Sequence, residues 1–162
     1  MKLLFSLFVF LIFFIKQDVS EIRKLYPNAA NSEILSKEFF SKLTAVTTES
    51  DKTLVAYKGA SITLISKFSK KIADKINHFK EGAKLVEFAV ASEPNNIEIR
   101  LIRLSIQANV PKIVKYNRNK QEDKDFILAH YKEQSGALKE YVKNFILQSK
   151  SFSALEKQTI KQ

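Results

Sequence analysis

The sequence predicts an all-α protein that folds as a single compact bundle of six or seven helices. Glycine and proline occur only three times each in 162 residues, so turn-forming residues are scarce. Lysine, leucine, isoleucine and alanine are frequent, which favours helices. Apolar side chains also recur every three or four positions from Leu35 to Ile146, which is the helical period. No segment predicts a strand.

Helical spacing defines six longer segments and a short one at each end. The longer segments cover residues 32–47, 52–70, 79–92, 97–108, 119–134 and 138–146. One short helix is expected over 21–26, ending at Pro27 because proline disfavours a helix at the residue before it, and another after Ser153. Between two of the longer segments, residues 69–78 are predicted to form an exposed basic connector. N-cap residues precede most helices, namely Asp18, Asn31 or Ser32, Asp51, Asn95 or Asn96, Asn119 and Ser153.

Small residues in two predicted helices indicate a close helix contact. Gly59 lies inside an apolar helix, where glycine costs about 1 kcal/mol relative to alanine, so we expect another helix to approach it closely. Gly82, Val86 and Ala89 follow the small–large–small pattern of a tetratricopeptide second helix, and Pro94 comes after them. No second copy of the pattern is present. We therefore predict one degenerate tetratricopeptide-like hairpin, with plain core packing as the alternative.

The first 20 residues are predicted to be a signal peptide, or a retained N-terminal anchor, ahead of an all-α domain over 21–162. Leu3–Ile15 is an uncharged stretch of 13 residues. That length fits the apolar core of a signal, about 7–15 residues, better than a spanning helix of about 20. No clean small-residue cleavage site follows it. We expect an exported protein of the periplasm or cell envelope, with membrane contact through residues 3–15 if the segment stays uncleaved.

Composition excludes several kinds of chemistry. The chain has no cysteine, which rules out disulfides, cysteine-based zinc sites and thiol catalysis. Three glycines cannot supply a phosphate loop or a dinucleotide fingerprint. His78 and His130 lie far apart in sequence, and a metal site needs several convergent ligands, so we interpret both as surface residues. The sequence thus predicts no catalytic residue, no metal site and no cofactor.

The net charge of +10 favours anionic partners, although a lysine-rich composition that serves only solubility is the alternative. Two stretches are strongly basic, one within residues 66–75 and one within 111–120. Aromatic residues for base stacking are scarce there, since only Phe68 and Tyr116 lie in them. We therefore interpret both stretches as solvated loops and expect no nucleic acid partner.

One set of polar residues is the candidate binding site. Arg100, Arg103 and Gln107 have i, i+3 and i+7 spacing and so share a helix face. Arginine suits carboxylate or phosphate contacts. With nearby aromatic and basic residues, the full candidate set is Tyr57, Lys58, Arg100, Arg103, Gln107 and Tyr116. Alternatively, the two arginines brace the bundle by pairing with Asp123 or Glu98 or with helix C-terminal carbonyls.

The leading functional hypothesis is an exported, non-enzymatic binding or scaffold module that holds a peptide or acidic partner in a helical groove. On this hypothesis, replacing Arg100 and Arg103 with alanine weakens capture without unfolding the domain. One alternative is an enzyme acting on an anionic envelope substrate, with the arginines as clamps. Another is a basic module at an anionic membrane surface. The sequence does not define the oligomeric state.

A family resemblance covers most of Glu21–Leu128. It is carried by the segments IRKLYPNAA, LVAYKGA, FKEGAKLVEFAV, EPNNIEIRLIRLSIQANVPKIVKY and EDKDFIL. These segments resemble a family of uncharacterised exported proteins of Bacteroidota, chiefly of flavobacterial type. The resemblance implies a signal sequence and a tetratricopeptide-like helical fold. It implies no activity.

Overall fold

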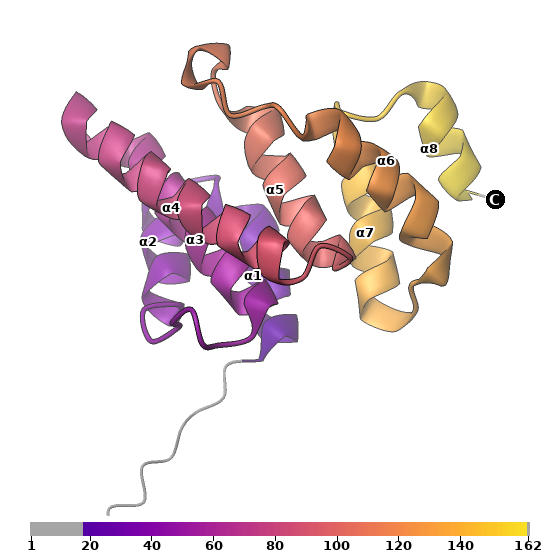
Figure 1. Ribbon diagram of the computed structural model, residues 1–162, viewed down its shortest axis with the longest axis horizontal. Helices are drawn as coiled ribbons and strands as arrows, with labels where there is room; N and C mark the ends of the chain where they lie inside the picture. The colour runs from indigo at the N-terminus through magenta and orange to yellow at the C-terminus, as the bar shows by residue number, and fades with distance from the viewer. Residues whose placement is uncertain (1–17, 162) are drawn as a thin grey trace, which may run out of the picture.

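The computed structural model describes residues 18–161, which form eight α-helices and two 3-10 turns and contain no strand (Figure 1). The α-helices are α1 (Val19–Ala29), α2 (Glu33–Lys42), α3 (Lys52–Phe68), α4 (Ile72–Ser92), α5 (Ile97–Asn109), α6 (Lys120–His130), α7 (Gly136–Gln148) and α8 (Ala154–Lys161). The 3-10 turns η1 (Lys112–Val114) and η2 (Tyr131–Glu133) precede and follow α6. The predicted all-α fold class is confirmed. The stated count of six or seven helices is too low by one or two, although each of the eight segments defined by helical spacing corresponds to one α-helix.

Most of the predicted helix caps form. The side chains of Asp18, Ser32, Asp51 and Asn96 each accept a backbone N–H in the first turn of the following helix. At α8, Ser153 and Glu156 bond reciprocally as a capping box. Asn119 occupies the predicted N-cap position of α6, but its side chain makes no cap bond and instead donates to Glu122 Oε2 at 2.8 Å.

Several predicted boundaries are also wrong; α2, for example, ends at Lys42 rather than at residue 47. α1 continues past Pro27 to Ala29, since a proline in the last turn removes only one hydrogen bond and Ala29 gains a buried place. α4 begins at Ile72, so most of the predicted connector 69–78 is helical. Ile72 and Ile76 extend the apolar stripe of Phe79 and Ala83 at helical spacing, and no glycine or proline interrupts it.

The close contact predicted at Gly59 is confirmed, and its partner is Gly82 on α4. A Cβ on Gly59 would lie 2.6 Å from the Gly82 carbonyl oxygen, and a Cβ on Gly82 would lie 2.4 Å from the Gly59 carbonyl oxygen. Real Cβ contacts are essentially never this short. α3 and α4 therefore touch backbone to backbone at a point where only glycine fits on both helices.

The hydrophobic core consists of two clusters that share α5, which lies in the middle of the molecule (Figure 1). Ile99, Ile102 and Ile106 of α5 pack with α1–α4 in the first cluster. Leu101 and Leu104 pack with α6–α8 in the second. Because α5 is covered on both sides, its polar residues are forced into the interior beside its apolar ones.

The predicted signal or anchor core at residues 3–15 lies outside the described residues. Within the described part, α1 begins at Val19 with Asp18 as its cap, so the bundle starts inside the predicted 1–20 segment. Val19 packs against the first core cluster. No helix between residues 18 and 161 is both long and apolar enough to cross a membrane.

Candidate functional site

Arg100 and Arg103 converge on a single carboxylate, that of Asp123 on α6. Arg103 Nε donates to Asp123 Oδ2 at 2.7 Å and Arg103 Nη2 donates to Oδ1 at 2.7 Å, a bidentate pair. Arg100 Nη1 donates to the same Oδ1 at 2.9 Å. Asp123 is 0% exposed and both arginines are buried. The shared helix face predicted from their spacing is thus confirmed, and it is turned toward α6.

Further acceptors surround this pair at the rim. Glu122 also accepts from Arg100, and Arg100 Nε donates to the carbonyl oxygen of Pro94 at 2.8 Å. Glu87 on α4 accepts from Arg103 Nη1 at 2.9 Å. Burial alone would lower the pKa of Arg103, but the hydrogen bonds and charges of Asp123 and Glu87 raise it above its ordinary value. The Arg103 guanidinium is therefore held as a cation beside acidic side chains.

Tyr116 belongs to the same network. Its hydroxyl donates to Glu87 Oε1 at 2.6 Å, so Glu87 bridges Tyr116 and Arg103. Burial and the adjacent Glu87 carboxylate both raise the pKa of Tyr116, so the hydroxyl remains a donor. The ring packs edge-on against Phe79 of α4, with the centroids 5.5 Å apart.

Tyr57 lies in a second ionic network on the other side of α5. Its hydroxyl donates to Glu98 Oε1 at 2.6 Å. Arg23 of α1 donates to both carboxylate oxygens of Glu98, each at 2.7 Å. Burial is the main reason that the pKa of Tyr57 is raised. The hydrogen bond that Arg23 donates to Glu98 raises the pKa of Arg23. This network joins α1, α3 and α5 through one buried carboxylate.

The remaining two candidates make no hydrogen bond to a residue of either network. Lys58 donates to the carbonyl oxygen of Thr44 at 3.1 Å and to that of Val46. These two hydrogen bonds stabilise the turn after α2. Gln107 is buried, and its Oε1 has no hydrogen-bond partner among the residues that the structure describes. The structure thus divides the six candidates among two networks and two separate positions, rather than around one open groove.

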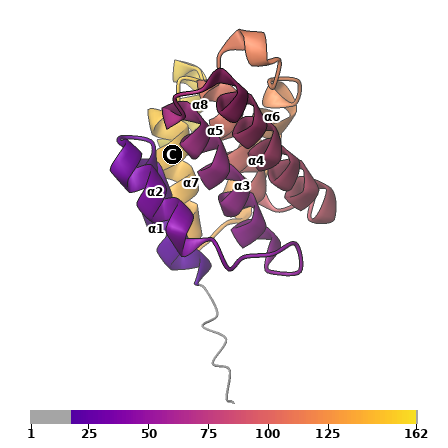
Figure 2. The same ribbon diagram turned by 90° about the vertical axis from the view of Figure 1, so that its left-hand side faces the viewer.

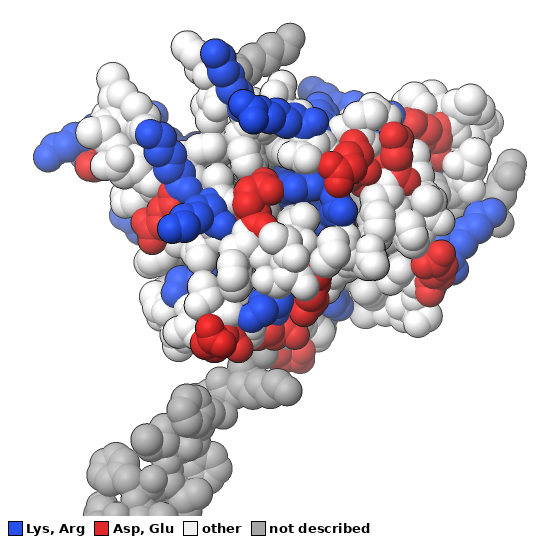
Figure 3. All heavy atoms as spheres, in the orientation of Figure 1, with Lys and Arg blue, Asp and Glu red and all other residues white. Residues whose placement is uncertain are grey.

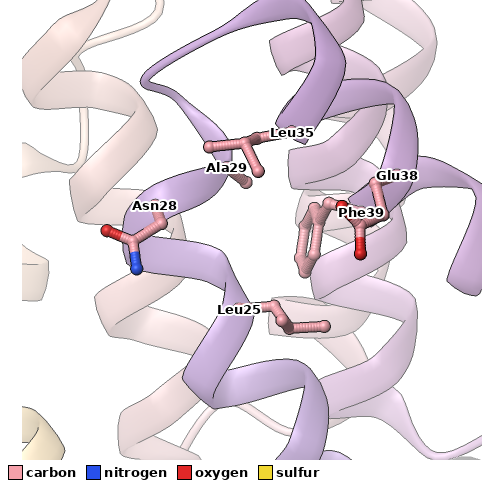
Figure 4. Close-up of a pocket in the computed structure, with 6 residues that line it drawn as sticks. All are labelled: Leu25, Asn28, Ala29, Leu35, Glu38 and Phe39. Atoms are coloured by element: carbon pink, nitrogen blue, oxygen red, sulfur yellow. The ribbon is translucent and has the colours of Figure 1, made fainter.

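Two surface hollows have no arginine in their lining. One, of about 170 Å³, lies between α1 and α2, where Leu25, Ala29, Leu35 and Phe39 form its apolar wall (Figure 4). The other, of about 190 Å³, lies at the end of α5, with Gln107, Tyr116 and Lys120 among its lining residues. Neither is lined by Arg100 or Arg103.

The two histidines lie in different surroundings. His78 Nδ1 lies 3.1 Å from Ser69 Oγ, and the His130 ring stacks on Phe126 with the centroids 4.0 Å apart. Between residues 18 and 161, no group of three or more histidine or acidic side chains could hold a metal ion.

Sequence reasoning named Asp123 and Glu98 as alternative partners of Arg100 and Arg103. Asp123 pairs with both arginines, whereas Glu98 pairs with Arg23 instead. It missed Arg23, which lies 75 positions from Glu98, because no local pattern links residues so far apart. The geometry supports the brace alternative for Arg100 and Arg103, while binding of an external partner stays a prediction.

No family model, curated protein or solved structure matches this chain. The class that the fold and the networks define is an all-α bundle whose central helix is held by buried ion pairs on two sides.

Proposed function

We propose that this chain is an exported, non-enzymatic binding module of the cell envelope that holds an acidic partner on its basic end. The basic end consists of residues 67–80 and 110–120. The first range holds five lysines and one aspartate, and the second holds three lysines, one arginine and no acid. Together they carry +8 of the net charge of +10. This concentration of charge is the observation that carries the proposal.

The exposed cations of the basic end are free to meet a partner. Lys70, Lys71, Lys75, Lys115 and Arg118 are all exposed. None of them takes part in an ion pair with another described residue. Figure 3 shows basic side chains along the upper left of the molecule, over the start of α4 and the loop after α5. Arg100 and Arg103 differ, since internal acids already occupy them.

Export, membership of the Bacteroidota family and a tetratricopeptide-like origin of the α3–α4 pair belong to this proposal. Export is supported by the apolar run at 3–15 after a basic residue. The tetratricopeptide-like origin is supported by the glycine contact between α3 and α4. The enzyme alternative remains untested.

The test compares two charge variants of the full chain on an acidic polysaccharide resin. The basic-end variant is Lys70→Glu/Lys71→Glu/Lys75→Glu. The matched control is Lys24→Glu/Lys132→Glu/Lys150→Glu, which changes net charge equally at exposed lysines elsewhere. We expect the basic-end variant to elute at clearly lower salt than the control. Equal elution of the two variants would show that only net charge matters and would overturn the proposal.

A further inference from the structure

The first turns of α4 form an apolar tip, which consists of the exposed side chains of Ile72 and Ile76. Ser69, directly after α3, reaches His78, so residues 72–77 lie beyond the level at which α3 ends. Figure 1 shows this part of α4 projecting from the bundle at the upper left. Ile72 is 76% exposed and Ile76 is 48% exposed, although both continue the stripe that packs on α3 further along. A large exposed side chain at the end of a helix needs an explanation when it belongs to an otherwise buried stripe.

A second apolar tip lies nearby, in the loop between α5 and α6. Ile113 in η1 is 87% exposed and Val114 beside it is also exposed. Lys115 follows with a positive φ of 53°, which turns the chain back toward the bundle. Tyr116 then fixes the loop against Phe79 of α4. Figures 1 and 2 both place this loop and the start of α4 at the same end of the molecule, opposite the start of α1.

Exposed cations flank both tips. Lys70, Lys71 and Lys75 lie around the first, and Lys115 and Arg118 lie beside the second. The two apolar tips, surrounded by exposed cations, are complementary to an interface in which a charged layer covers an apolar one. Anionic lipid attracts basic residues near its surface, and exposed aliphatic side chains gain free energy by entering the acyl boundary.

Other acidic partners explain these features less well. Single-stranded nucleic acid needs free aromatic faces for stacking, but Phe79 and Tyr116 pack on each other. An acidic peptide needs a groove to bury its side chains, whereas these isoleucines stand on two separate protrusions. Lipid uses both the charges and the protruding apolar atoms.

We infer that the acidic partner of the basic end is an anionic lipid surface, into which Ile72, Ile76, Ile113 and Val114 insert while the surrounding lysines contact the headgroups. This inference rests on the proposed function and names its partner. It concerns a face distinct from residues 3–15, so the two can be tested apart.

The chain has no cysteine, so one introduced cysteine is a unique labelling site. The full chain carries Ile72→Cys, Ile113→Cys or, as control, Leu155→Cys on α8, where the native leucine is 72% exposed. Each is labelled with an environment-sensitive fluorophore and mixed with vesicles of phosphatidylglycerol and phosphatidylcholine, or of phosphatidylcholine alone. We expect a blue shift of the label at residues 72 and 113 only, and only with the anionic vesicles. Because the label reports its own position, binding through residues 3–15 does not imitate this result.

The basic-end variant provides the second measurement. Each basic residue near an anionic surface contributes about fivefold in partitioning, so losing three lysines should weaken the labelled response by about 100-fold. If the labels at 72 and 113 stay unshifted while the basic-end variant still loses its resin binding, the lipid inference fails and the proposed function stands. If resin binding is also insensitive to these lysines, both fail. A shift at residue 155 equal to those at 72 and 113 would show undirected adsorption and overturn the inference.

Discussion

The Asp123 carboxylate is fully buried and pairs with two arginines, Arg100 and Arg103, that are also buried. A buried ion pair contributes little net stability against an apolar replacement, but removing one partner leaves an uncompensated charge. The stability of the α5–α6 contact therefore depends on the completeness of this group.

Asp123→Asn should lower the free energy of unfolding by about 3–5 kcal/mol, because it leaves Arg100 and Arg103 buried with only the rim acids Glu87 and Glu122. Urea unfolding followed by far-UV circular dichroism measures this loss. Glu122→Gln is the control, since the Glu122 side chain is half exposed, and it should cost less than about 1 kcal/mol. Similar losses for the two variants would contradict this view of the network.

The same geometry changes the expectation for the arginines themselves. The sequence alone predicts that Arg100→Ala/Arg103→Ala keeps the fold and weakens partner binding. With Asp123 fully enclosed, we now expect the double variant to lose stability, because the buried carboxylate would be unpaired. A thermal melt equal to that of the native chain would restore the binding hypothesis.

Among the elements, α3 and α4 form the closest contact, and glycine makes it possible. Alanine in a helix interior is normally about 1 kcal/mol better than glycine. At Gly82 the added Cβ would meet a backbone oxygen that cannot rotate away.

Gly82→Ala should therefore destabilise the protein by about 3 kcal/mol, the upper part of the range for overpacking. Gly136→Ala is the comparison. It has open space around its Cβ position but a φ of 55°, so its cost comes only from backbone strain, about 1 kcal/mol. Denaturant midpoints for the two variants decide the order, and a neutral Gly82→Ala would mean that the helices can separate freely.

α8 offers a pH-dependent contact. The hydrogen bond from Lys124, then the backbone N–H of Ser153, lower the pKa of Glu156 to about 2 from an ordinary value of 4.5. Since the folded-state pKa is the lower one, this stabilisation is present above about pH 4.5 and is lost as the pH falls toward 2.

Glu156→Gln should cost less than about 1 kcal/mol at neutral pH, because the pair with Lys124 is partly exposed. The difference between the variant and the native chain should shrink to nothing as the pH approaches 2. Chemical unfolding across this pH range measures it. A difference that persisted at low pH would show that Glu156 acts through packing or as a neutral acceptor.

The whole molecule is organised around α5, which belongs to both core clusters. Because α5 contributes side chains to both clusters, displacing α5 from one cluster would also expose apolar side chains of the other. The two halves are therefore expected to unfold together, although the apolar contacts divide into two sets.

Fluorophores on Ile34→Cys in α2 and Leu155→Cys in α8 should report one coincident unfolding transition. Leu101→Ala removes a side chain of the second cluster only, yet it should lower the midpoint at both labels, with a loss of about 2–5 kcal/mol. Two separate midpoints would show that the halves are independent.

Sequence alone determined the helical class, most of the caps and the close approach at Gly59, because these depend on residue type and on neighbours within a few positions. It also placed Arg100 and Arg103 on one helix face. Only the tertiary structure decided what that face meets, since Glu87 comes from α4 and Asp123 from α6, and it likewise paired Glu98 with the distant Arg23. It likewise decided that Ile72 and Ile76 stand free, because a periodic stripe does not reveal where the partner helix ends. Local spacing defines a surface, but its burial depends on which distant residues the folded chain brings against it.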